Sequence, residues 1–312
     1  MISWRRRALL LISWRSKILF EKWIGASAVA FLQAIKLTDR RRSADFAAAV
    51  MRKIGPLRPE HRVGRENLRA AFPEKSDAEI EKILRGVWDN LGRVAVEFAH
   101  LDEFKLPGSA AASPSDIITA SPEILERARR ILASGPAAIA FGAHLANWEL
   151  PALAVKLFGA KTAVLYRRPN IRAIGDVVVR LRTPLMGELI PTGLSAPVKL
   201  ARLLESGVHV GMVVDQHYGR GVEVTFFGRR CLANPLIAQL ARHTERPIYG
   251  LRVVRLADGN SFRGEITEAI EPVRDAEGRI EVVGTTQAIT SVIEGWVREH
   301  PEQWLWLHRR WR

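Results

Sequence analysis

Two side chains suited to acid–base chemistry follow a short apolar run in the middle of the chain. The run covers 137–141, His144 follows it after a glycine, and Glu149 lies five residues further on. The run predicts a buried strand, and Asn147 predicts the cap of a helix behind it. A neutral imidazole at a strand end can accept a proton, and a nearby carboxylate can orient it. We therefore predict that His144 is a general base and Glu149 its partner, provided that His144 lies on the turn before the helix.

The same spacing occurs a second time, in a different setting. His61 and Glu66 are also separated by four residues, and a chain with eight histidines should contain about one such pair by chance. The segment around them predicts a solvated basic helix with no strand before it. We therefore interpret His61 as a structural residue.

Further candidates follow the other predicted strands. Asp215 ends the apolar run 208–214, where it is either a site residue or a strand-end cap. Because the carboxyl ends of parallel strands line the ligand crevice of an open α/β sheet, arginines there could bind phosphates in bidentate contacts. The alternative is a solvated basic helix face. The candidates are Arg167, Arg180 and Arg182, with Arg309 and Arg310 as a possible basic rim after three tryptophans near the C-terminus.

These residues need a sheet to position them. From residue 136 onward apolar runs alternate with helical patterns, which predicts an α/β fold with a mixed, largely parallel central sheet flanked by helices. Segments 222–227 and 261–267 should be antiparallel or peripheral. Helices are expected at 43–54, 59–72, 77–104 and 121–133 before the sheet, and at 285–300 after it. The strands are expected at 137–142, 161–166, 188–191, 208–214 and 247–255, with a short one at 117–118, and the helices between them at 147–157, 170–181, 196–205 and 233–243.

The positive charge is concentrated near the N-terminus. The net charge is +14, and residues 1–65 hold 15 Lys/Arg against 4 Asp/Glu. Tryptophans and cations alternate there with the apolar runs 8–12 and 24–35, neither of which reaches the length of a spanning helix. We predict that residues 1–36 form an amphipathic helical anchor on an anionic membrane. A helix packed on its own domain and a single marginal span are the alternatives. Residues 40–42 should be a loop or a juxtamembrane charge cluster, and 37–312 a single domain.

The sequence lacks the motifs of several other classes of protein. The chain has neither of the glycine-rich phosphate loops, no G-x-S-x-G elbow and no ligand pair with zinc spacing, so we expect no metal and no cofactor. The single cysteine excludes a disulfide scaffold. A basic, tryptophan-rich flank could also bind nucleic acid, but the apolar runs favour lipid, and no nucleic acid partner is expected.

An ordered set of motifs resembles a known family, the late acyltransferases of lipid A biosynthesis. The likeness runs from about residue 40 to the C-terminus. It rests on Glu66-Asn67-Leu68-Arg69-Ala70-Ala71-Phe72-Pro73, Gly142-Ala143-His144 with Glu149, Tyr166-Arg167-Arg168-Pro169-Asn170, Asp215-Gln216, Val224-Thr225-Phe226-Phe227-Gly228 and Pro301-Glu302-Gln303-Trp304 with Trp306 and His308-Arg309-Arg310.

This resemblance implies an activity. Residues 37–312 would be an acyltransferase domain that moves a fatty acyl chain from acyl-acyl carrier protein to a hydroxyl of a lipid A precursor, at the cytoplasmic face of the bacterial inner membrane. The family's His-x4-Asp/Glu pair falls on His144 and Glu149, its strand-end aspartate on Asp215, and its arginine on Arg182, with Arg180 the competing placement. Another glycolipid or a lysophospholipid is the alternative acceptor. A nucleic-acid-binding protein and a non-catalytic membrane scaffold are the alternatives from other classes.

Overall fold

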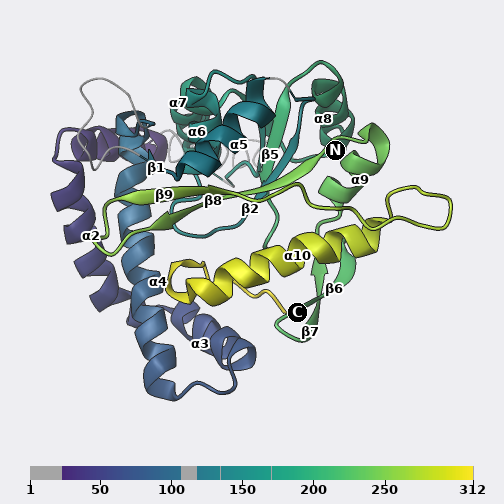
Figure 1. The fold of residues 1–312 in the computed structure, drawn as a ribbon. Coiled ribbons are helices and arrows are strands. Elements are labelled where there is room, and N and C mark those ends of the chain that lie inside the picture. Colours follow the sequence, from purple (N-terminus) through teal and green to yellow (C-terminus); the bar gives the residue numbers. More distant parts are fainter. Residues whose placement is uncertain (1–22, 107–117, 134, 170, 312) are drawn as a thin grey trace, which may run out of the picture.

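A single mixed sheet forms the centre of the molecule in the computed structural model (Figure 1). The structure describes residues 23–106, 118–133, 135–169 and 171–311. The sheet has seven strands in the order β1-β9-β8-β2-β5-β3-β4, and every pairing is parallel except that of β8 with β9. The predicted α/β fold with a largely parallel sheet is therefore confirmed. The strands are β1 Ile118–Thr119, β2 Ile139–Gly142, β3 Thr162–Tyr166, β4 Glu188–Pro191, β5 His209–Val213, β8 Ile248–Arg255 and β9 Phe262–Ile266.

Helices cover the sheet on both sides. In Figure 1, α6 and α7 lie above the sheet and α10 runs beneath it. The predicted helices are present with shifted ends: α7 continues past the expected residue 181 and contains Pro184. Ser121 caps α5 as expected, since its Oγ accepts a hydrogen bond from the Ile124 amide at 3.2 Å. The helices are α5 Pro122–Ala133, α6 Leu150–Leu157, α7 Arg172–Met186, α8 Ala196–Glu205, α9 Leu236–Thr244 and α10 Val282–Glu299.

A β-hairpin outside the main sheet corrects one prediction. The sequence predicts the strand at 222–227 but not its partner, because it predicts a helix from residue 233. The strands β6 Val222–Phe226 and β7 Arg229–Ala233 are antiparallel, and α9 begins only at Leu236. The two-residue turn has positive φ at Phe227 (52°) and Gly228 (68°), the backbone that tight hairpins require. A phenylalanine is an unusual residue there; its buried ring packs against Phe72 and Trp306.

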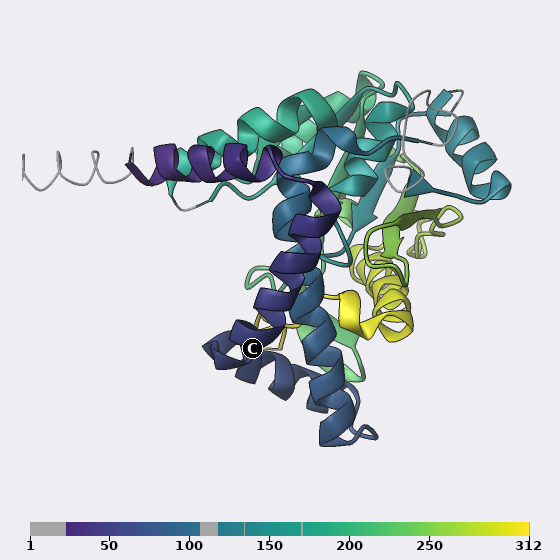
Figure 2. The same cartoon turned by 90° about the vertical axis from the view of Figure 1, so that its left-hand side faces the viewer.

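The segment before the sheet is helical. It consists of α2 Arg40–Ile54, α3 Pro59–Ala71, α4 Asp77–Glu97 and the 3₁₀ segment η2 Phe98–Glu103, with α2 packed along α4 (Figure 2). The predicted loop at 40–42 is wrong: these residues form the first turn of α2, because Asp39 accepts a hydrogen bond from the Arg42 amide at 2.9 Å and caps the helix. Arg40 is buried, with its guanidinium 4.5 Å from the Phe104 ring.

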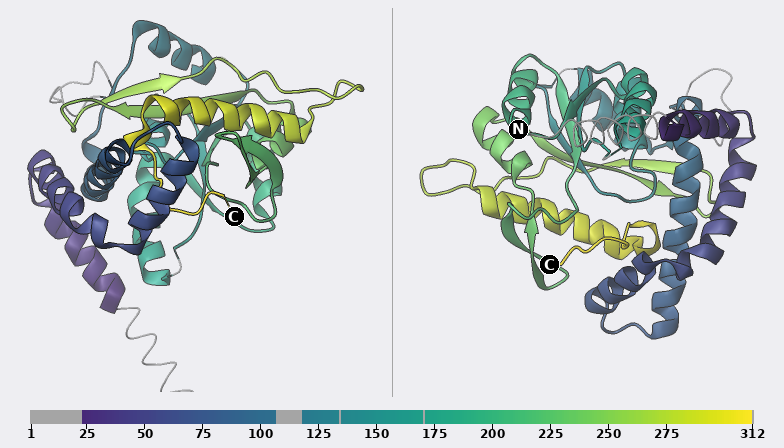
Figure 3. Two further views of the ribbon diagram at one scale, coloured as in Figure 1. Left: turned by 90° about the horizontal axis from the view of Figure 1, so that it is seen from below. Right: turned by 180° about the vertical axis from the view of Figure 1, so that it is seen from behind.

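Only part of the predicted anchor can be described. Residues 1–22 lie outside the described residues, and residues 23–36 form a helix that leads into α2 (Figures 2 and 3). Its Gly25 lies so close to Ala173 of α7 that an added Cβ would approach the alanine Cβ to 2.4 Å. At its other end, Lys36 pairs with Asp102 of η2. In the described ranges no helix combines the length and apolarity that crossing a bilayer demands. The boundary at residue 36 stays a prediction.

Candidate active site

The register of two parallel strands brings a histidine and an aspartate together. In the pairing of β2 with β5, Gly142 lies opposite Val213. His144 and Asp215 each follow two residues later, so both leave the same edge of the sheet side by side. One Asp215 oxygen lies 2.8 Å from His144 Nδ1, and the other accepts a hydrogen bond from the His144 amide at 2.9 Å. Asp215, predicted as either a site residue or a strand-end cap, thus contacts the candidate base directly.

The environment of Asp215 keeps its carboxylate ionised. Its side chain is completely buried, and the indole Nε1 of Trp304 donates to it at 2.8 Å. Burial alone would raise the pKa of Asp215, but the positive charge and the hydrogen bonds of His144 hold that pKa well below its usual range. An ionised carboxylate can only accept hydrogen bonds. The proton between the two residues is therefore assigned to His144 Nδ1, which leaves the lone pair on Nε2.

His144 presents this nitrogen to a cavity. Its side chain is 19% exposed, and Nε2 has no hydrogen-bond partner in the part of the chain that the structure describes. Burial alone would lower the pKa of His144, but Asp215 and, to a smaller extent, Glu149 raise it above the ordinary 6.5. The Trp148 ring centre lies 5.2 Å from that of the imidazole. The imidazole is therefore held in one tautomer, with its basic nitrogen Nε2 at the wall of the cavity.

Glu149 does not make the contact expected of it. Within the described residues no hydrogen bond joins it to His144; instead it forms a buried ion pair with Arg182. The reason is local: Glu149 occupies the N-cap position of α6, after a turn in which Ala146 has φ = 48°, so its side chain leaves the turn in another direction. The orienting contact that we predicted for Glu149 is made by Asp215.

Of the two competing arginines, Arg182 is the one at this site. It lines the cavity, whereas Arg180 is exposed and does not. The Arg182 guanidinium also lies 5.5 Å from the centre of the Phe98 ring. Its Nε is buried and has no hydrogen-bond partner among the described residues. One Arg182 donor is therefore paired with Glu149, and another remains available.

The other predicted arginines separate into two groups. Arg167 is exposed and lines the cavity at the end of β3, and Arg309 is exposed near the C-terminus. Arg310 is buried: its Nη1 donates to the Leu232 carbonyl at 2.7 Å and its guanidinium lies 5.3 Å from the Phe226 ring centre. Arg310 therefore holds the hairpin in place, contrary to the predicted rim.

The cavity measures about 320 Å³ and is mainly apolar. It lies between the ends of the central strands and helices α6 and α7. Gly211 and Ala140 are among its lining residues and lie opposite each other in the pairing of β5 with β2. A Cβ added to Gly211 would meet only the Ala140 Cβ, at 4.0 Å, so the glycine leaves the cavity open. An apolar hollow beside a general base suits a substrate with a hydrocarbon chain.

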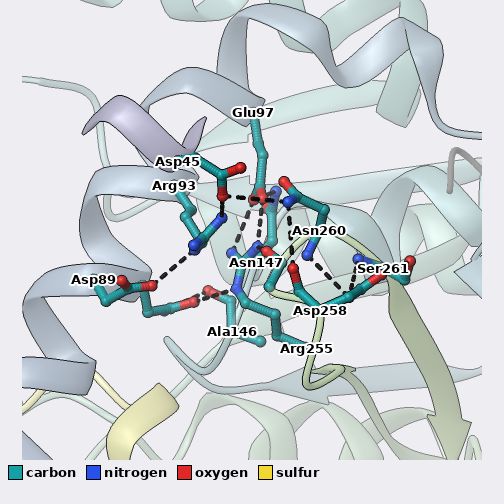
Figure 4. A network of polar contacts seen from close by, with 12 residues as sticks. Asp45, Asp89, Arg93, Glu97, Ala146, Asn147, Arg255, Asp258, Asn260 and Ser261 are labelled. Carbon is teal, nitrogen blue, oxygen red and sulfur yellow. Dashed lines mark hydrogen bonds and ion pairs between the residues drawn. The ribbon is translucent and has the colours of Figure 1, made fainter. Parts of the chain in front are cut away.

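A buried polar network fixes the turn that carries His144 (Figure 4). Glu97 of α4 accepts from Asn147 Nδ2 at 2.9 Å and forms a two-point ion pair with Arg255 of β8. Asn90 Nδ2 donates to the Ala146 carbonyl at 3.0 Å, and its Oδ1 accepts from Arg255 at 2.8 Å. Four polar side chains thus satisfy one another and hold the strained turn in one conformation.

Sequence reasoning missed this network and the role of Trp304. Trp304 is fully buried in the core, and its indole also donates a hydrogen bond to Asp215. Its neighbour Leu305 donates its amide to the His144 carbonyl at 3.0 Å. The available signal was the Gln-Trp-x-Trp segment 303–306 in the ordered motif set; nothing in the sequence pointed to Asn90, Glu97 or Arg255.

His61 lies elsewhere, as expected of a structural residue. Its Nε2 lies 3.1 Å from Glu81, and its Nδ1 accepts from Trp88 Nε1 at 3.0 Å. It is buried, so the predicted solvated helix face is wrong at this position. Glu66, which matches the spacing, pairs instead with Arg62. Both ring nitrogens of His61 are occupied, which distinguishes it from His144.

Comparison with known proteins shows which family this chain resembles. The model of the family described as "Bacterial lipid A biosynthesis acyltransferase" matches residues 12–312. The chain is 26% identical over 259 residues to the Lipid A biosynthesis palmitoleoyltransferase of Escherichia coli (strain K12), and the match covers 82% of this chain and 80% of the relative. The Lipid A biosynthesis acyltransferase of Shigella flexneri matches with the same identity and coverage.

Proposed function

The chain belongs to the bacterial lipid A biosynthesis acyltransferase family, and from this premise we propose that it transfers a fatty acyl chain from acyl-acyl carrier protein to a hydroxyl of a lipid A precursor. The observation that carries the proposal is the 2.8 Å contact of His144 Nδ1 with Asp215, which leaves Nε2 as a base at the wall of an apolar cavity. A general base, an apolar cavity that can hold an acyl chain and a predicted membrane anchor at the N-terminus together favour acylation of a lipid.

The reaction needs one base and no protein nucleophile. His144 Nε2 takes the proton of the acceptor hydroxyl while the hydroxyl oxygen attacks the thioester carbonyl carbon. The tetrahedral intermediate then collapses: the carbon–sulfur bond breaks, and His144 returns the proton to the departing thiolate. Asp215 stabilises the imidazolium between the two steps. A thioester is already activated, so no covalent acyl-enzyme is required.

Arg182 is our candidate for stabilising the oxyanion. Its Nε is buried and unpartnered within the described chain, and its other end is fixed by Glu149. A positioned donor of this kind typically contributes about 10²–10³ in rate. Glu149 thus acts in two ways: it orients Arg182, and its charge favours the protonated form of His144.

The cavity and the surface charge suggest places for the rest of the substrates. The acyl chain would lie in the 320 Å³ cavity, along Gly211 and Ala140. Exposed Arg167, Arg180 and Arg309 are candidates for the acceptor's phosphates and the acidic carrier protein. With the basic segment 1–36 on an anionic membrane, the enzyme would work at the cytoplasmic face of the inner membrane.

The test is acyl transfer by purified protein with acyl-carrier protein as donor. His144→Ala should lose at least about 10³ in kcat, whereas His61→Ala should stay near wild type. If the two variants behave alike, the site is wrongly assigned. Offering a lipid A precursor, another glycolipid and a lysophospholipid side by side identifies the acceptor. Retention on DNA without binding to liposomes would instead favour a nucleic-acid-binding protein.

A further inference from the structure

A second apolar hollow lies on the outside of the molecule. It is a groove of about 920 Å³ between the helix 23–36, α2, α4 and α7. Among its lining residues only Arg42, Glu149 and Arg182 carry charge. The rest of its wall is mostly apolar and includes Phe31, Phe46, Ala95 and Trp148.

This groove is open to the surroundings, unlike the core. Phe31 is 66% exposed and Phe46 is 72% exposed, although both are large apolar side chains. On the same N-terminal segment, Trp23 is 68% exposed and Leu37 is 89% exposed. A contiguous apolar surface of this kind marks a binding site for an apolar ligand or a membrane.

The groove and the catalytic cavity meet at one place. Trp148, Glu149 and Arg182 line both hollows. Trp148 is the residue whose ring lies 5.2 Å from the imidazole of His144, and Arg182 is the cation with a free buried donor. A molecule in the groove therefore contacts residues that also line the cavity.

A reaction without an acyl-enzyme requires donor and acceptor to be bound at the same time. Two separate apolar sites, the cavity and the groove, would allow this. The cavity is lined by strand ends and is the smaller of the two, about 320 Å³, which suits one straight chain. The groove is larger, about 920 Å³, and its outer wall is the helix 23–36 that we assign to the membrane surface. It suits several chains that arrive from a bilayer.

We propose that this groove binds the acyl tails of the lipid acceptor and so sets its headgroup hydroxyl against His144. The inference rests on the proposed function, and it adds the chemistry by which the acceptor is recognised: an amphiphile with hydrocarbon tails, held separately from the donor's chain. If the enzyme bound the acceptor only through its sugar and phosphates, the groove would have no role in catalysis.

The test narrows the groove without touching the residues shared with the cavity. Ala95 is an exposed residue of α4 that lines the groove, so Ala95→Trp places an indole in it. Ala133 is an exposed helical alanine on α5 that lines neither hollow, and Ala133→Trp is the matched control. Acyl transfer is measured to a lipid A precursor with its tails and to a tail-free glucosamine disaccharide phosphate.

We expect Ala95→Trp to raise KM for the tailed acceptor at least about tenfold, to change kcat little, and to leave transfer to the tail-free acceptor unchanged. Ala133→Trp should match wild type with both. An unchanged KM for Ala95→Trp, or an equal loss with both acceptors, overturns the inference. Full activity of His144→Ala in the same assay would instead overturn the proposed function, so the two failures are distinguishable.

A second measurement does not depend on a folded variant. A precursor with a photoreactive diazirine in one tail is irradiated with the wild-type protein, and the labelled peptides are identified by mass spectrometry. Labels on α2, α4 and the helix 23–36 support the groove. Labels confined to α6 and β5, which line the cavity, place the acceptor's tails with the donor's chain and contradict the proposal.

Discussion

Asp215 holds His144 at two points, with one carboxylate oxygen 2.8 Å from the imidazole Nδ1 and the other 2.9 Å from the backbone amide. The second contact fixes the backbone of the histidine, and the first fixes its ring and tautomer. The pair depends on the parallel register of β2 with β5, which sets the two residues side by side. The orientation of this candidate base is therefore set by the sheet more than by the helix that follows it.

The ion pair of Glu149 with Arg182 predicts coupled effects on activity. If Glu149 acts mainly through Arg182, Glu149→Gln and Arg182→Gln should each slow acyl transfer, and the double variant should be little slower than the worse single one. A double-mutant cycle on kcat measures this. Fully additive losses would show that Glu149 acts on its own, as the sequence spacing suggested.

We expect the small size of Gly211 to determine which lengths of acyl chain the cavity accepts. Gly211→Leu places a side chain in the cavity, beside Ala140, where the glycine leaves space. We expect the preference among donors to shift toward shorter acyl chains by about tenfold or more. The measurement is kcat/KM for a series of acyl-carrier proteins of increasing chain length. Gly295→Leu, at an exposed glycine of α10 with open space around it, is the control. An unchanged preference in Gly211→Leu would place the donor's chain elsewhere.

The buried pair of Arg255 with Glu97 predicts a large effect on stability. Arg255→Met would leave the Glu97 carboxylate buried without its cation and should lower the free energy of unfolding by about 3–5 kcal/mol. Urea unfolding measures the change. Arg62→Met removes the exposed pair with Glu66 and should cost no more than about 0.5 kcal/mol. Equal small losses would mean that the network contributes little to the fold.

Local patterns were enough to predict the frame of the molecule. Apolar runs located β2, β3, β5 and β8 inside the sheet, because a buried parallel strand must be apolar on both faces, and the edge strand β4 was also predicted. They also located His144 and Asp215 as strand-end residues. The helical turn at Arg40 was not predicted, because it depends on a single capping aspartate. The strand β7 was not predicted, because it depends on an unusual Phe-Gly turn.

The contacts of the site residues could not be predicted, because they join residues that are far apart in the sequence. Which carboxylate reaches His144 is set by the alignment of two strands 71 positions apart in sequence. Trp304 and Arg255 arrive at the site from the C-terminal segment and from β8. The His-x4-Glu spacing drew attention to His144 and Glu149, but in the fold Glu149 contacts Arg182 and not the imidazole.

The most direct test of His144 as a base oriented by Asp215 is the pH dependence of kcat/KM for wild type and Asp215→Asn. The base acts when neutral, and Asp215 raises the pKa of His144 above 6.5, so wild-type activity should rise with pH through a midpoint above that value. Asp215→Asn should lower kcat by about 10²–10⁴ and move the midpoint to lower pH. A variant that keeps both the wild-type rate and the wild-type midpoint would contradict the account.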